Sequence, residues 1–189
     1  LPISVQTMLD PADCGPACIA LSQDIQGQTF DYPEEFFKEK IHAIRRPRPD
    51  EFQIKEAAEK IKSSKNPIII SGGGVFYSDA MEELSNFAVK HNIPVTQTVM
   101  GYSTMKRDHS HYAGQIGGLG GKNTNSLAEQ TDLAIAVGTK LADFTTGSWA
   151  NFENENFQLV SINVSRFDAN KHLAQAVVGD AKVSLDELS

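Results

Sequence analysis

The sequence predicts an α/β fold built on a parallel β-sheet. Several short segments are continuously apolar instead of alternating with polar residues, which indicates strands buried on both faces. Helical patterns or long connections separate these segments, as right-handed crossovers between parallel strands require. Together, these observations predict a Rossmann-like sheet of about five or six strands with helices on both faces.

The regular part of the chain is predicted to begin with a helix at Asp50. Asp50 is a favourable N-cap, and Gln53 stands three residues later, as in a capping box. An apolar face with helical spacing follows, made of Ile54, Ala57, Ala58 and Ile61. Pro67 then opens a short strand that ends near Ser71.

A second helix is predicted after the glycine-rich turn Gly72–Gly74. Asp79 would cap this helix, with Glu82 at the capping-box position. Asn92 suits a left-handed C-terminal residue, and Pro94 prevents the helix from continuing. The apolar face of the helix consists of Ala80, Leu84, Phe87 and Ala88.

Further strands and helices are predicted along the rest of the chain. The strands are Pro94–Val99, Asp132–Gly138, Gln158–Asn163 and Ala176–Asp180. A short helix is expected at Asn125–Gln130, after a run of glycines, and a final helix should pass through Leu185 and Leu188.

The first part of the chain, residues 1–49, has a different character. Ala17–Leu21 could form one buried strand, and turn residues surround it. Because one strand cannot build its own core, this part should lean on the following domain or on a partner domain. The chain begins with leucine instead of methionine, so we expect a fragment of a longer protein. We therefore expect a boundary between residues 1–49 and residues 50–189.

The composition argues against several classes of function. The formal net charge is −7, whereas proteins that bind nucleic-acid phosphates need clustered lysine and arginine. The one dense basic run, Arg45–Arg48, contains proline and is predicted to be a solvated linker. No apolar run approaches the roughly 20 residues that span a bilayer, so no membrane partner is expected. Two cysteines without a signal peptide indicate a cytoplasmic protein.

Glycines stand at the predicted carboxyl ends of the strands, where ligands bind in open α/β sheets. Glycine permits a close backbone approach, so we name Gly72, Gly73, Gly74, Gly101 and Gly138 as candidate crevice residues.

The dinucleotide fingerprint nevertheless fails. A G-x-G-x-x-G motif from Gly72 would need glycine at Tyr77, and Gln97 and Thr98 stand where an acid should bind a ribose. A phosphate-binding P-loop fails as well, because no Gly-Lys-Ser/Thr closes the turn. A tight corner that packs a helix against a strand is therefore the favoured interpretation.

The other polar residues give no reaction centre. His109 and His111 form an H-x-H pair in a polar context and are predicted to be solvated loop residues without a metal. Lys140 and Asp143 fit a solvated loop equally well. No Ser/His/Asp set and no acid–base carboxylate pair can be nominated, so no catalytic residue and no metal ligand is predicted.

The cysteines and the tryptophan are assigned structural roles. Cys14 and Cys18 are predicted to be small buried hydrophobic residues, because no activating base can be identified near them. Trp149 is predicted to be a packing anchor or an interface residue.

The order of these segments resembles the central domain of thiamine-diphosphate enzymes. Matching segments, in order, are "NPIIISGGGV", "ELSNFAVKHNIPV", "TVMG", "HYAGQIGGLG", "TDLAIAVGTKL" and "VVGDAKVSLDEL". The segments "DPADCGPACIALSQDIQG" and "INVSRFDANKH" are similar to a family member of inositol catabolism, which opens the ring of a cyclic diketone to 5-deoxy-glucuronate. The resemblance implies that residues 1–49 are the tail of a pyrimidine-binding domain and a linker.

The resemblance also implies where the cofactor lies. In this family, thiamine diphosphate and Mg²⁺ lie between a pyrimidine-binding and a diphosphate-binding domain, and their motifs do not occur here. Gly179-Asp180 is followed by Ala181 and Lys182 instead of completing a Gly-Asp-Gly motif. The residues that carry over are structural: Gly72–Gly74, Gly101, Gly114 and Gly138. The implied role is a non-catalytic spacer between these two domains, in a homo-oligomer that is a dimer or a tetramer.

Two alternatives remain at this point. One is an FAD- or NAD-binding module of flavoprotein or sirtuin type. FAD is not expected, because the segments Thr139–Phe144 and Ile162–Ser165 lack the arginine and the acids of FAD-binding relatives. A sirtuin would need a cluster of zinc-binding cysteines. The other alternative is the central domain of a different thiamine-diphosphate enzyme, such as a relative of acetohydroxyacid synthase.

Overall fold

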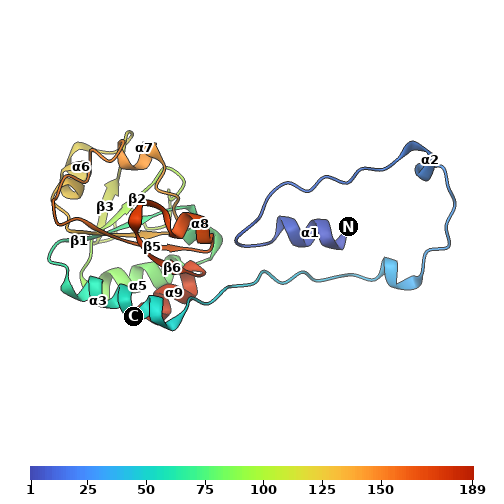
Figure 1. Ribbon diagram of the computed structural model, residues 1–189, viewed down its shortest axis with the longest axis horizontal. Coiled ribbons are helices and arrows are strands. Elements are labelled where there is room, and N and C mark those ends of the chain that lie inside the picture. Colours follow the sequence, from blue (N-terminus) through green and yellow to red (C-terminus); the bar gives the residue numbers. More distant parts are fainter. The chain divides into compact units, whose positions relative to one another are not determined.

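The computed structural model describes residues 1–189, which divide into two units, Leu1–Arg45 and Arg46–Ser189 (Figure 1). The second unit begins four residues before the boundary expected from the sequence. None of the helices in either unit is both long and apolar enough to cross a membrane.

The first unit contains little regular structure. Its helical segments are α1 (Pro2–Met8), α2 (Gln23–Gln26) and the 3₁₀ turn η1 (Glu34–Phe37), and none of them contains a buried residue. The predicted strand at Ala17–Leu21 is wrong: this segment is extended chain without a paired neighbour. Without a second strand, its backbone groups have no ladder to join.

The prediction of buried cysteines is also wrong, because Cys14 and Cys18 are both exposed free thiols. No residue of the first unit is buried, so this unit offers no interior in which a small apolar side chain could be placed.

The second unit is built on a six-stranded parallel sheet, which confirms the predicted fold class. The strand order is β3-β2-β1-β4-β5-β6. The strands are β1 (Pro67–Ser71), β2 (Val95–Gln97), β3 (Tyr112–Gln115), β4 (Leu133–Val137), β5 (Gln158–Asn163) and β6 (Gln175–Val178). Only β3 lacked a sequence prediction, because this edge strand is half-buried and contains a glycine, so it gives no continuous apolar run.

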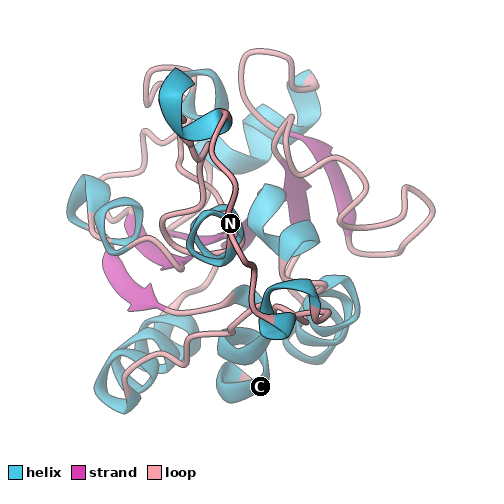
Figure 2. Cartoon of the chain, turned by 90° about the vertical axis from the view of Figure 1, so that its right-hand side faces the viewer, coloured by secondary structure: helices cyan, strands magenta, loops and turns pink.

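Helices cover both faces of this sheet. In Figure 1, α3, α5 and α9 lie on one side of the strands and α6 and α7 on the other. Figure 2 distinguishes the helices of the chain from its strands by colour. The helices and the 3₁₀ turn of this unit are α3 (Glu51–Ser63), α4 (Gly73–Tyr77), α5 (Met81–His91), α6 (Lys122–Glu129), α7 (Asp143–Thr146), α8 (Arg166–Ala169), η2 (Lys171–Leu173) and α9 (Ala181–Leu188).

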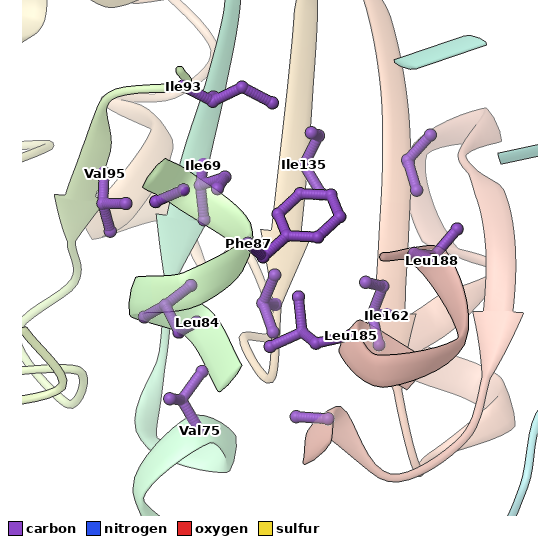
Figure 3. Packing of buried hydrophobic residues seen from close by; sticks show 14 of the residues in the cluster. Ile69, Val75, Leu84, Phe87, Ile93, Val95, Ile135, Ile162, Leu185 and Leu188 are labelled. Atoms are coloured by element: carbon purple, nitrogen blue, oxygen red, sulfur yellow. The ribbon is translucent and has the colours of Figure 1, made fainter. Parts of the chain in front are cut away.

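Alternate residues of β1, β4 and β5 divide between two hydrophobic clusters. On β1, Ile69 joins the larger cluster, and Ile68 and Ile70 join the smaller one. In the larger cluster, Phe87 of α5 and Leu185 of α9 pack over the strands (Figure 3). Both faces of the sheet are therefore buried, which explains why the strands are continuously apolar.

The helix ends test the capping predictions. Asp50 caps α3 by accepting the N–H of Phe52, as predicted. Gln53 does not complete a capping box, because its Oε1 accepts the N–H of Val178 at 2.9 Å. Ala80 stands at the N-cap of α5, so the prediction that Asp79 caps this helix is wrong. Asp79 is instead a left-handed turn residue with φ 55° that lets the chain turn between α4 and α5.

Asn92 ends α5 in the left-handed conformation with φ 52°, as predicted.

The basic run Arg45–Arg48 is not simply a solvated linker. Arg46 lies 3.2 Å from the carboxylate of Asp180 and also donates to the carbonyl of Ser78. The N–H of Asp180 donates to Pro47 O at 2.8 Å. These contacts bind Arg46 and Pro47 to the corner between β6 and α9. The sequence-based expectation of a solvated linker did not include these contacts.

Asp132 ties the start of β4 to the end of α3 and is expected to make stability depend on pH. Burial alone would raise the pKa of Asp132, but donation from the Ser64 hydroxyl and from the N–H groups of Lys65 and Asn66 lowers this pKa below 3.8 on balance. A carboxyl group whose pKa is lower in the folded state stabilises the fold at pH values above its unfolded-state pKa. This stabilisation is lost as the pH falls through its folded-state pKa.

We therefore expect Asp132→Asn to lose stability relative to the wild type near neutral pH, with the difference shrinking below about pH 3.8. Urea denaturation at a series of pH values measures this difference. Ser64→Ala, which removes one of the donors, should show a smaller version of the same dependence. A difference that stays constant down to about pH 2 would contradict the assignment.

Candidate functional site

The candidate glycines meet at the carboxyl edge of the sheet. Gly72 follows β1, and its N–H donates to Val137 O at 2.8 Å. Gly74 lies at the start of α4, and its N–H donates to Gly138 O, also at 2.8 Å. Gly101 belongs to the turn after β2. The structure therefore brings the predicted residues together across β2, β1 and β4, which are neighbours in the sheet.

Most of these glycines face protein backbone at very short range. A Cβ on Gly74 would lie 2.6 Å from Gly138 Cα, and a Cβ on Gly72 would lie 2.4 Å from Gly138 O. A Cβ on Gly101 would lie 2.1 Å from Ser71 O. Gly73 is less crowded, because its nearest such contact is Met100 O at 3.2 Å. This geometry favours the tight-corner interpretation, in which α4 packs closely on the ends of β1 and β4.

A buried polar network stabilises the loop after β2. Ser71 Oγ and Thr104 Oγ1 are 2.7 Å apart, and Thr104 Oγ1 also donates to Gly101 O at 2.8 Å. Gln97 Nε2 donates to Met105 O at 3.0 Å. The sequence analysis did not predict this network. Its sign in the sequence was the polar residues at the ends of the segments "IIIS" and "PVTQT".

A second set of polar contacts joins the loops after β4 and β5. Asn163 Nδ2 donates to Thr139 O at 3.1 Å, and Asn163 Oδ1 accepts the N–H of Ser165 at 3.0 Å. Lys140 is exposed, as predicted for a solvated loop. Asp143 is also exposed and accepts the Ser148 hydroxyl at 2.8 Å. Asn163 and Asp143 are thus engaged in holding loops together.

The two histidines of the H-x-H pair are bound to α5 instead of being freely solvated. His109 Nε2 lies 3.0 Å from Ser85 Oγ, and His111 Nε2 lies 3.1 Å from Asn92 Oδ1. Both histidines lie in the loop before β3, as predicted, but they are half-buried and not fully solvated. The sequence hid these contacts because the hydrogen-bond partners lie on the preceding helix.

Trp149 is half-buried and packs among aromatic rings, which confirms its prediction as a packing anchor. Its ring centroid lies 5.6 Å from that of Phe152 and 4.5 Å from that of His172. Trp149 itself has φ 68°, and His172 has φ 60°. The tilted contact between the Trp149 and His172 rings therefore joins two residues with a left-handed backbone, and Trp149 packs against the smaller hydrophobic cluster.

The residues of the carboxyl edge do not fit thiamine diphosphate and its metal ion. No group of three or more histidine, cysteine or acidic side chains is arranged to hold a metal ion. The N–H groups of Gly72, Gly74 and Gly101 donate to the carbonyls of Val137, Gly138 and Thr98, so they are not free to bind a diphosphate. The polar contacts at this edge hold the neighbouring loops in place.

The sequence also matches a known family. The family described as "Thiamine pyrophosphate enzyme, central domain" matches residues 54–188. This range begins in α3 and ends at the last residue of α9, so it covers the whole six-stranded sheet.

Two curated relatives carry the same name, 3D-(3,5/4)-trihydroxycyclohexane-1,2-dione hydrolase. The protein of Clostridium perfringens (strain 13 / Type A) is 44% identical over 98% of this chain. The protein of Bacillus licheniformis is 43% identical over 97% of this chain. The chain spans 29% of the length of each of these relatives.

Among solved structures, the chain is similar to benzoylformate decarboxylase from Polynucleobacter necessarius. The TM-score is 0.74 with 21% identity, and the alignment covers 97% of this chain and 34% of that one. At this level of identity, the similarity concerns the fold.

Proposed function

Because this chain belongs to the family of thiamine pyrophosphate enzyme central domains, we propose that it is the central domain of a hydrolase that opens the ring of trihydroxycyclohexane-1,2-dione. The product would be 5-deoxy-glucuronate, formed in the cytoplasm during inositol catabolism. The observation that carries this proposal is the 44% identity over 98% of the chain to a protein named for this reaction.

Within that enzyme, we assign this domain a structural role. It would space and orient a pyrimidine-binding and a diphosphate-binding domain, which together would hold thiamine diphosphate and Mg²⁺. Residues 1–49 would be the end of the pyrimidine-binding domain and its linker, and the whole enzyme would be a dimer or a tetramer. The engagement of the carboxyl-edge glycines with neighbouring backbone supports a role in packing.

The alternatives are less well supported. The relatives reported above share one name, and that name is neither of a flavoprotein nor of a sirtuin. We keep Gly72, Gly73, Gly74, Gly101 and Gly138 as candidates for a nucleotide contact, with Gly73 the least crowded of those at the turn after β1. An absorbance spectrum of the purified chain tests this contact, because a stoichiometric flavin band would favour the flavoprotein reading.

The assay for the proposed function compares two proteins. We expect the full-length natural protein, supplied with thiamine diphosphate and Mg²⁺, to open the ring of the diketone, and the 189-residue chain alone to give no turnover. Product formation is measured by mass spectrometry. Ring opening by the 189-residue chain would contradict the structural role, and a full-length protein active only on a 2-oxo acid instead of the diketone would reassign the enzyme.

A further inference from the structure

Five large apolar side chains are exposed together on α4 and on the loop after β2. We call this surface the Met100 face, and its residues are Phe76, Tyr77, Val99, Met100 and Tyr102. Tyr77 is 76% exposed and Met100 is 70% exposed. Side-chain atoms of these two residues lie within 4 Å of one point beside Gly73, so the two segments adjoin. Single exposed apolar residues are ordinary, whereas several of them on two adjoining segments favour an interaction site.

The backbone beneath the Met100 face is firmly held. The N–H of Thr98 donates to Ser71 O at 3.0 Å, which continues the pairing of β2 with β1. Thr104 closes the loop through its hydroxyl, which contacts both Ser71 Oγ and Gly101 O. Gly101 packs its Cα against the end of β1.

This loop thus buries the polar Thr98 and Thr104 while it exposes the apolar Val99 and Met100, the reverse of the usual arrangement at these positions. Because the loop is already ordered, a partner that covers the face loses little conformational entropy on binding.

The charges beside the Met100 face indicate what a partner should present. Arg107 lies over the ring of Tyr102, 5.3 Å from its centroid, and donates to the Tyr102 hydroxyl at 3.0 Å. Neither Arg107 nor Lys106 has a carboxylate within 4.0 Å, and the acid of the same loop, Asp108, has no cationic partner either. An aromatic anchor beside an unpaired guanidinium fits an apolar protein surface that carries a carboxylate.

We propose that the Met100 face is the docking surface for another domain of the same whole enzyme, one that presents apolar side chains and a carboxylate opposite Arg107. This inference rests on the proposed function. The chain corresponds to 29% of the length of its relatives, so most of a relative's sequence is available to supply that domain. A second copy of this chain is the competing occupant, and the experiment below separates the two.

Hydroxyl-radical footprinting of two proteins tests the proposal. In the 189-residue chain, Tyr77, Met100 and Tyr102 should be oxidised readily, because all three are exposed. In the full-length natural protein, we expect their oxidation to be slower by about fivefold or more, as for side chains at the core of an interface. Phe52, which is 65% exposed on α3, is the internal control and should react similarly in both proteins.

Equal oxidation of the face in both proteins would overturn the proposal. Protection in the 189-residue chain that grows with its concentration would overturn it in favour of a second copy.

Matched variants of the full-length protein give a second readout. Met100→Ser and Arg107→Glu should each restore oxidation of Tyr77, whereas Phe52→Ser and Lys62→Glu on α3 should not. The same substitutions in the 189-residue chain should leave its unfolding midpoint unchanged, because these side chains are exposed and none is part of the core.

Failure of the proposed function can be distinguished from failure of this inference. A full-length protein that is inactive on the diketone but protected at the face retains this inference. An active one with an unprotected face refutes it.

Discussion

Replacing Gly101 with alanine is expected to lower the free energy of unfolding of the compact unit Arg46–Ser189 by about 3 kcal/mol or more. The new Cβ would lie 2.1 Å from Ser71 O and 2.8 Å from Ser71 C. Ser71 ends β1, which pairs with β2 on one side and β4 on the other, so its backbone cannot move aside without disturbing both neighbours. Urea denaturation followed by circular dichroism measures the loss.

Gly121→Ala is the matched control for this substitution. Gly121 precedes α6, and a Cβ there would meet only Thr124 Oγ1, at an ordinary 3.8 Å. Because Gly121 is the N-cap of α6, where alanine is less favourable than glycine, we expect this variant to lower the free energy of unfolding by about 1 kcal/mol or less. If Gly101→Ala were equally harmless, the loop after β2 would be free to shift, and the Met100 face would lose the rigidity assigned to it.

Replacing Asp180 with alanine is expected to cost about 2–3 kcal/mol of stability. Asp180 is 3% exposed and caps α9, where its Oδ1 accepts the N–H of Lys182 at 3.0 Å. Its Oδ2 lies 3.2 Å from Arg46 Nη1. The substitution therefore removes a helix cap and also leaves a partly buried arginine without its carboxylate.

Two further variants separate these contributions. Asp180→Asn keeps an oxygen that can cap α9 but removes the charge, so it should cost less than Asp180→Ala. Glu187→Ala removes the carboxylate that pairs with the exposed Arg48 and should cost about 1 kcal/mol or less. If Asp180→Ala were as stable as Glu187→Ala, the contacts of Arg46 and Pro47 with Asp180 would not stabilise this corner.

These two sites support the same account of the domain. Gly101 and Asp180 are both adapted to hold backbone segments close together, one at the loop after β2 and the other at the corner between β6 and α9. The structural role proposed above requires a fixed shape, which both sites would maintain. Gly101, the cap at Asp180 and the buried Thr104 hydroxyl are all engaged with backbone of this unit.

The sequence alone determined the fold class and most of its elements. β1, β4 and β5 were recognised from runs such as Pro67–Ser71, because strands buried on both faces must be apolar throughout. Asn92 marked the end of α5, because few residues other than glycine and asparagine tolerate a left-handed backbone. The quoted segments also determined the family, because their order and spacing extend over the whole sheet.

Tertiary structure alone decided the features that depend on a partner distant in the sequence. Gln53 has the spacing of a capping box, yet it accepts a hydrogen bond from Val178. His109 lies in a polar loop, yet it contacts Ser85 on α5. Cys14 seemed a candidate for burial, yet its unit has no interior. The physical reason is shared: apolar periodicity and backbone conformation are local properties of a chain, whereas the partner of a polar group and the burial of a side chain depend on which distant segments the fold brings together.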